Sequence, residues 1–292
     1  MLSHLVMNHA ARLKKSPRTF RRLTGMNPRE FDNLLEKLLP LYQAWHDARL
    51  SKRTRIRKPG AGGQFQLALA ERLLMLLIYY RCYTTHVFLG FLFQIDDSNV
   101  GRNITPLEKL LAGIFRIPEK RVNLDSEEID VLFFDGTEQR VERPAKKQKR
   151  HYSGKKKTHT RKVQVVVSKR KDPSGKTGTK IEAVSKRFPG TMHDKKIYDH
   201  ARVVTPPGTT RQADSGYQGT NMDTPHKKLP KKELTLVQKK QNRLHSSERV
   251  CVEHGIGKMK IWKIVSERFR NPRPSHSLIV KNSAGLSNLM FA

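Results

Sequence analysis

The stretch VLFFD, from Val131 to Asp135, decides the fold, because a short apolar run leads directly into a carboxylate. Short runs of β-branched and bulky apolar residues are typical of buried strands. Similar runs follow at 163–167, 181–184 and 234–237. We therefore predict four strands in the second half of the chain, with Asp135 at the end of the first.

Two further acids occupy different settings. Asp214 opens the sequence Asp-Ser-Gly-Tyr, and Glu253 lies in a stretch with helical spacing. On a helix at about 100° per residue, Arg249, Glu253 and Lys260 share one face. Each aspartate alone is more simply explained by a turn, which Asp and Gly favour. Together, acids after two strands and on a distant helix are the elements that a ribonuclease-H-like sheet brings to one point, where two divalent ions roughly 4 Å apart support phosphoryl transfer.

The charge of the chain indicates the partner. Lys and Arg number 58 against 26 acids, giving a formal net charge of +32, which a polyanion such as nucleic acid neutralises. Structural binding of RNA is the simpler alternative. The apolar stretch Leu73–Tyr80 falls far short of the roughly 20 residues that span a membrane, so we expect no membrane partner.

The cysteines and the N-terminal residues indicate the compartment. The 292 residues contain two cysteines, Cys82 and Cys251, whose distance along the chain favours neither a zinc module nor a disulfide scaffold. The basic N-terminus lacks the long apolar stretch that is typical of a secretory signal. We expect a reducing cytoplasm.

The first hundred residues have the pattern of helices. Asn27-Pro28-Arg29-Glu30 supplies an N-cap acceptor, a proline at the first helical position and a glutamate at the third, which predicts a helix to about Trp45. Residues 49–58 are basic and run into a glycine-rich segment, so we interpret them as a linker or loop. A long buried helix is predicted at 67–80 and a shorter one at 84–93.

A tight break at Gln94-Ile95-Asp96 precedes a third helix, capped by Asp96 or Asp97, with Val100 and Ile104 facing inward. This layout is typical of a helix-turn-helix, although any all-helical domain contains such pairs. Side chains suited to reading base edges would line its polar face: Ser98, Asn99, Arg102 and Asn103.

A basic run occupies residues 140–171, where 14 Lys or Arg accompany one acid, Glu142. Such a run is too charged for a core and suits a phosphate backbone, and we expect Lys155, Lys156 and Lys157 to bind DNA. The aromatic ring of Tyr152 is placed to stack on an unpaired base or to form an ordinary surface patch. The run ends at Asp172-Pro173-Ser174-Gly175, which predicts a hairpin turn. Beyond it, Asp194 follows His193 and is best interpreted as a helix cap, with a supporting role near the metal as the alternative.

Several strings resemble bacterial insertion-sequence transposases of the DDE class, in the branch related to Harbinger elements. The resemblance runs in order from about Tyr80 to Leu289. Its strings are Phe-Asp-Gly-Thr-Glu, Glu-Arg-Pro, Tyr-Ser-Gly-Lys-Lys-Lys, Pro-Gly-x-x-His-Asp-Lys-Lys, Ala-Asp-Ser-Gly-Tyr-Gln-Gly and Arg-Val-x-Val-Glu-His-x-Ile-Gly.

The resemblance implies which residues act. Asp135, Asp214 and Glu253 match the catalytic acids, which would bind two Mg²⁺ ions, with Mn²⁺ able to substitute. Arg249 and Lys260 match the arginine and lysine of the family signature and would hold phosphates. Two departures stand out: the tyrosine of the signature is absent near Ser246, and Gly255 stands where a better helix former is expected.

The predicted fold class is α/β: a ribonuclease-H-like mixed sheet with flanking helices, preceded by an all-α helix-turn-helix region. We predict a helical DNA-binding region at 1–125, with the helix-turn-helix at about 84–109, and a DDE catalytic domain at 126–292. By the resemblance, the chain binds the terminal inverted repeats of its element, hydrolyses a phosphodiester at each end and joins the 3′ hydroxyls to target DNA.

The partners follow from that activity. We expect double-stranded DNA, as element ends and target, and a second copy of the chain in a homodimer, in the cytoplasm at the nucleoid. The alternatives are a metal-dependent nuclease of the same fold and an inactive, transposase-derived DNA-binding regulator.

Overall fold

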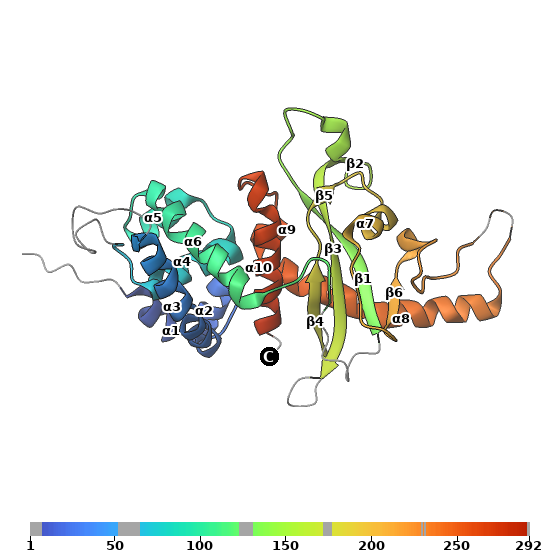
Figure 1. Ribbon diagram of the computed structural model, residues 1–292, viewed down its shortest axis with the longest axis horizontal. Coiled ribbons are helices and arrows are strands. Elements are labelled where there is room, and N and C mark those ends of the chain that lie inside the picture. The colour runs from blue at the N-terminus through green and yellow to red at the C-terminus, as the bar shows by residue number, and fades with distance from the viewer. Residues whose placement is uncertain are drawn as a thin grey trace, which may run out of the picture. The chain divides into compact units, whose positions relative to one another are not determined.

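The computed structural model describes residues 8–51, 65–122, 131–171, 177–228, 230 and 232–290. The chain forms two compact units (Figure 1). Unit 1 comprises Met1–Phe115 with Trp262–Ile264, and unit 2 comprises Arg116–Ile261 with Val265–Ala292. Most of the predicted linker at 49–58 and the predicted hairpin turn at Asp172–Gly175 lie outside the described residues.

Unit 1 is helical. Its helices are α1 (His9–Lys14), α2 (Pro17–Thr24), α3 (Pro28–Ser51), α4 (Leu69–Cys82), α5 (His86–Phe93) and α6 (Asp97–Phe115). The capping box before α3 is confirmed, since the Asn27 N–H donates to Glu30 Oε2 at 2.6 Å and the Glu30 N–H donates to Asn27 Oδ1 at 2.8 Å. α3 continues to Ser51, beyond the predicted end near Trp45, so the start of the predicted linker is helical.

The α5–α6 pair has the predicted helix-turn-helix layout. Thr85 caps α5 by accepting from the Phe88 N–H, and Gln94 ends it in the left-handed conformation. The Asp96 carboxylate accepts from the Ser98 N–H at 2.9 Å, which fixes the start of α6. Val100 and Ile104 are buried, so the inward face of α6 is confirmed.

Unit 2 is a mixed sheet with helices on both faces (Figure 1). Its principal strands are β1 (Val131–Arg140), β3 (Thr158–Lys171), β4 (Thr177–Val184) and β6 (Thr210–Ala213). β1 pairs with β3 antiparallel and with β6 parallel, and β4 pairs antiparallel with β3. The shorter elements are η1 (Gln148–His151), β2 (Tyr152–Ser153), β5 (Phe188–Pro189), η2 (Ser215–Tyr217), α9 (Lys263–Ser266, divided between the units) and η3 (Arg273–Ser275).

The three predicted runs at 131–134, 163–167 and 181–184 are confirmed as strands. The fourth, at 234–237, is wrong, because Thr235 is the N-cap of α8 (Leu236–Lys260) and forms a capping box with Gln238. Asp135 does not end its strand, since β1 continues to Arg140.

Helices α7 (Asp194–Ala201), α8 and α10 (His276–Leu289) cover the sheet. Phe134 and its partner Val166 belong to the buried cluster on the α7 side. Neighbouring residues alternate between faces, so Asp135 points to the α8 side. The packing on that side accounts for Gly255, because a Cβ there would lie 3.0 Å from Val167 Cγ2. The glycine that is unfavourable for a helix lets α8 approach β3 closely.

Candidate active site

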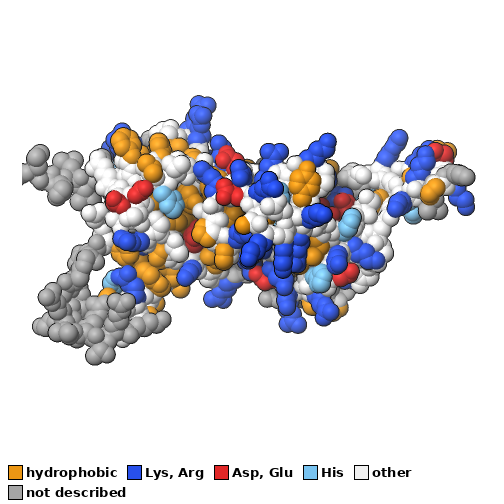
Figure 2. Space-filling model, turned by 90° about the horizontal axis from the view of Figure 1, so that it is seen from above, with side chains coloured by type: hydrophobic (Ala, Val, Ile, Leu, Met, Phe, Trp, Pro, Cys, Tyr) orange, Lys and Arg blue, Asp and Glu red, His pale blue; other side chains and the backbone are white. Residues whose placement is uncertain are grey.

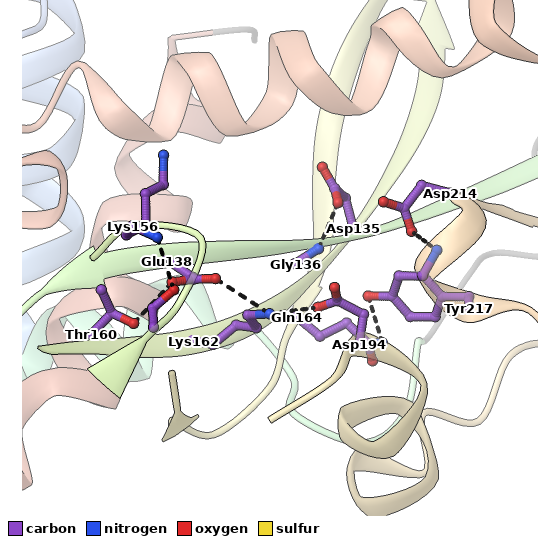
Figure 3. Close-up of polar contacts among 12 residues, drawn as sticks. Asp135, Gly136, Glu138, Lys156, Thr160, Lys162, Gln164, Asp194, Asp214 and Tyr217 are labelled. Atoms are coloured by element: carbon purple, nitrogen blue, oxygen red, sulfur yellow. Dashed lines mark hydrogen bonds and ion pairs between the residues drawn. The ribbon is translucent and has the colours of Figure 1, made fainter. Parts of the chain in front are cut away.

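Asp135 and Asp214 are brought together by the parallel pairing of β1 and β6. Phe134 of β1 pairs with Ala213, the last residue of β6, and an aspartate follows each of them. Adjacent strands lie about 4.8 Å apart, which places the two carboxylates side by side (Figure 3). Asp135 accepts from the Gly136 N–H at 2.7 Å and Asp214 from the Gly216 N–H at 2.9 Å. Among the described residues, these local N–H groups are the hydrogen-bond partners of the two carboxylates, whose remaining lone pairs stay available.

The electrostatics of the pair favour a bound cation. Burial raises the pKa of the Asp135 carboxyl to about 6, and the neighbouring Asp214 and Asp194 charges also raise it, whereas the Gly136 N–H and Arg249 lower it. A carboxyl whose ionised form is disfavoured by burial and by like charges gains from an added positive charge.

Glu253 lies on α8, as predicted, but the structure does not bring it to the aspartates. Its exposed side chain lines a separate cavity of about 610 Å³ with Lys169 of β3 and Cys251. Within the described part of the chain, no three His, Cys, Asp or Glu side chains form a ready metal-binding group. By contrast, Arg249 and Lys260, which flank Glu253 on the same helix face, both interact electrostatically with Asp135.

Asp194 lies against the opposite face of β1, at the start of α7. A Cβ on Gly136 would lie 2.3 Å from its Oδ1, and a Cβ on Gly216 would lie 3.3 Å from its Oδ2. The carboxylate is therefore held between the two backbone segments that carry Asp135 and Asp214. Lys162 extends this contact, since its Nζ lies 3.3 Å from Asp194 Oδ1 and 3.4 Å from Glu138 Oε1 (Figure 3).

Tyr217 is a site neighbour that the sequence patterns did not single out. Its side chain is completely buried, and Gln164 Nε2 donates to its hydroxyl at 3.2 Å. Burial raises its pKa well above the ordinary value, and Asp194, Asp135 and Asp214 add to that shift. Its position directly after Asp-Ser-Gly was the available signal. The phenol belongs to the buried cluster on the α7 side, with Phe134 and Ala213.

The predicted DNA-reading face of α6 is only partly exposed. Ser98 and Arg102 are exposed, and Asn99 Oδ1 accepts from the Arg102 guanidinium at 2.9 Å. The assignment of Asn103 to this face is wrong, because its side chain is buried at 6% exposure and donates to the Asn99 carbonyl. Its own carbonyl accepts from buried Arg72, so Asn103 has a packing role.

The three lysines Lys155, Lys156 and Lys157 are exposed in the turn between β2 and β3. Figure 2 shows Lys and Arg side chains gathered densely in the middle of the face turned to the viewer. Such a cationic surface is suited to a phosphate backbone.

Comparison with known proteins identifies the family. The family described as DDE superfamily endonuclease matches residues 134–288, and the family described as helix-turn-helix of DDE superfamily endonuclease matches residues 65–116. The chain belongs to the DDE superfamily endonucleases. Its catalytic unit is therefore ribonuclease-H-like, and the resemblance found in the sequence to DDE-class transposases is confirmed.

Two relatives of this DDE endonuclease cover most of its length. "Probable transposase for insertion sequence element IS702" of Microchaete diplosiphon is 28% identical over 284 residues, which are 94% of this chain and 95% of that protein. "Putative transposase for insertion sequence element IS112" of Streptomyces albus G is 27% identical over 262 residues, or 88% and 89% of the two chains. No solved structure matches the chain.

The DDE endonucleases generally depend on divalent metal, and the two aspartates fit one. Mg²⁺ prefers oxygen ligands and commonly binds through one or two carboxylates while keeping several waters. Asp135 and Asp214 supply such a pair with open lone pairs. None of the described helices is long and apolar enough to cross a membrane.

Proposed function

We propose that this chain is a DNA transposase that binds the terminal inverted repeats of its own element, cuts a phosphodiester at each end and joins the 3′ hydroxyls to target DNA. The observation that carries this proposal is the pairing of Asp135 with Asp214 beside Arg249 and Lys260, in a DDE endonuclease with a helix-turn-helix.

Each acid has a distinct part in the proposal. Asp135 and Asp214 hold Mg²⁺, with Mn²⁺ able to substitute, and two bound ions would supply Lewis acidity and an activated water or 3′ hydroxyl. Glu253 is the third acid. Its support is its place on the helix face between Arg249 and Lys260, both of which act on Asp135.

The cations position the DNA. Arg249 and Lys260 bind phosphates next to the acids, and Lys155, Lys156 and Lys157 hold the backbone farther along. In unit 1, α6 enters the major groove, where Ser98, Asn99 and Arg102 contact base edges. Because two ends must be processed together, the active form is a homodimer on DNA, at the nucleoid.

A product assay tests the proposal. The full chain is incubated with Mg²⁺, a supercoiled target plasmid and labelled fragments from each side of the gene, which would carry the element ends. The expected products are fragments cut at the inverted repeats with free 3′ hydroxyls, together with labelled plasmid formed by joining. EDTA is the control.

Three outcomes separate the candidate functions. Cutting without joined plasmid would identify a nuclease of the same fold. Binding to the ends with no cutting in either Mg²⁺ or Mn²⁺ would identify a regulator and overturn the proposal. Joined plasmid that depends on the metal supports a transposase.

A further inference from the structure

A basic cleft of about 860 Å³ adjoins the candidate active site within unit 2. Five exposed cations line it, against two acids, Glu138 and Glu267. The cations are Arg140, Arg143, Lys156, Lys260 and Arg268. Arg143 donates to Gln148 and Arg268 lies 3.5 Å from Glu142, whereas Arg140 and Lys156 form no ion pair with any described residue. An excess of exposed cations in a hollow indicates an anionic ligand.

Lys260 connects the cleft to the catalytic acids. Burial and the neighbouring Lys156 lower the pKa of Lys260, while Asp135 and Glu138 raise it. The ammonium group therefore lies within electrostatic reach of the candidate metal site and of a second lysine. Two close ammonium groups repel each other, and a phosphate between them would remove that repulsion. A phosphodiester chain that extends from the acids into the cleft would pass close to Lys260.

The size of the cleft indicates whether it suits single-stranded or duplex DNA. Its volume lies within the range of roughly 300–1,000 Å³ that is usual for small-ligand pockets. Such a hollow has room for a few nucleotides of one strand. The cleft therefore suits an unpaired strand.

An exposed aromatic ring beside the cleft supplies a second, independent feature of single-strand binding. Tyr152 is 45% exposed, and its ring packs edge-on against His159 with centroids 5.6 Å apart. His159 itself lines the cleft. Proteins that bind single strands combine a cationic groove with aromatic rings on which bases stack.

We propose that this cleft, bounded by Arg140, Lys156 and Lys260 and flanked by Tyr152, binds single-stranded DNA. It receives the unpaired strand next to the cut element end, the phosphates along the cations and one base on Tyr152. This role rests on the proposed function, which supplies the unpaired strand.

Binding assays in metal-free buffer test the cleft separately from catalysis. The full chain is titrated into a fluorescein-labelled 12-nucleotide oligothymidine and, separately, into a 20-base-pair duplex of random sequence. Tyr152→Ala is expected to weaken oligothymidine binding about fivefold or more, since a stacked base contributes about 1–3 kcal/mol, and to change duplex binding little. Tyr152→Phe keeps the ring and is expected to restore binding. Arg140→Ala should weaken oligothymidine binding more than duplex binding.

Lys120→Ala is the charge-matched control, because Lys120 is exposed and does not line the cleft. Thermal melts followed by circular dichroism identify any variant that fails to fold. If Tyr152→Ala does not fold, Tyr152→Leu is used in its place. Equal losses on single strand and duplex, or no loss, would overturn the cleft proposal. Selective losses in a protein that does not cut DNA would leave the cleft in place and remove only the proposed function.

Discussion

Both units contain acids that are at least partly buried, but the two sets have different partners. In unit 1, Glu71 accepts from the Ala10 N–H at 2.8 Å, and Glu108 accepts from the Tyr80 hydroxyl at 3.0 Å. These partners are 61 and 28 residues away in the sequence. In unit 2, Asp135 and Asp214 accept from N–H groups one and two residues away.

We infer that this difference separates carboxylates with a structural role from those with the proposed functional role. An acid bonded to a distant element contributes to the packing of the unit, and its removal leaves a buried donor unsatisfied. An acid bonded to its own turn keeps its other lone pairs for a ligand. Glu71 and Glu108 therefore hold helices of unit 1 together, whereas Asp135 and Asp214 of unit 2 keep lone pairs for the cation that we propose.

The strongest test of this contrast is the removal of one active-site charge. We expect Asp135→Asn and Asp214→Asn to lower DNA cleavage by roughly a thousandfold or more, because the amide keeps the shape but loses the charge that holds the metal. Glu253→Gln should do the same if α8 supplies the third acid. Cleavage rates and binding to the element ends are measured together, and binding should change little.

Glu71→Gln is the matched control in unit 1. It should leave the cleavage rate per folded molecule near that of the wild type, because Glu71 bonds to α1 within unit 1. A wild-type cleavage rate in any of the three active-site variants would remove that acid from the site.

The next test uses the pH dependence of unit 1. Burial raises the pKa of Glu108 from 4.5 to about 7, and the hydrogen bond from Tyr80 lowers it in part. Because the folded-state pKa exceeds the unfolded value, the stability linked to Glu108 is full below about pH 4.5 and is lost as the pH rises through about 7. This upward shift of the Glu108 pKa corresponds to about 3 kcal/mol of unfolding free energy.

Glu108→Gln should therefore unfold at higher urea concentration than the wild type at pH 8.5, and at nearly the same concentration at pH 4.5. The measurement is the unfolding free energy of unit 1 at the two pH values, followed by the fluorescence of Trp45 and Trp262, which both belong to unit 1. If the variant and the wild type differ in unfolding free energy by the same amount at both pH values, burial does not raise the pKa of Glu108.

Much of the fold could be predicted from local patterns. The capping box before α3, the inward face of α6 and the three apolar strands follow from periodicity and capping chemistry. β6 escaped prediction because Arg211 and Gln212 interrupt its apolar pattern. The run at 234–237 was wrongly predicted as a strand, because a short apolar run has the same composition at the start of a helix as in a strand.

The sequence predicted the acids of the candidate site, but it did not predict the residues that surround them. Asp135 was expected at a strand end, because it directly follows the apolar run at 131–134. In the structure β1 continues past it, and distant contacts cover the polar side chains that follow, Gln139 through the Glu267 carbonyl and Glu138 through Lys162. Tertiary contacts likewise bury Asn103. Contacts of this kind leave no signal in spacing or composition.

A smaller effect is expected where an acid supports the site without facing it. Asp194→Asn should lower cleavage about 10- to 100-fold without abolishing it, because the carboxylate contacts Gly136 and Gly216 and pairs with Lys162. Metal affinity, measured by calorimetry, should fall in parallel. Total loss of cleavage with normal folding and unchanged metal affinity would instead assign Asp194 a direct part in the chemistry.

The smallest expected effect concerns the affinity for DNA. It distinguishes sequence recognition by unit 1 from binding of the phosphate backbone by unit 2. Arg102→Ala should cost about 1 to 2 kcal/mol on the cognate end and little on random duplex, because a base contact carries sequence information and Arg102 must share its donors with Asn99. Neutralising Lys155, Lys156 and Lys157 together should weaken binding to every sequence and reduce the log-log salt slope by about 0.9 for each phosphate that the protein no longer neutralises. Both variants are measured on both duplexes across a salt series. Equal losses for Arg102→Ala on cognate and random DNA would show that α6 holds the backbone, and base reading would then have to lie elsewhere in the protein.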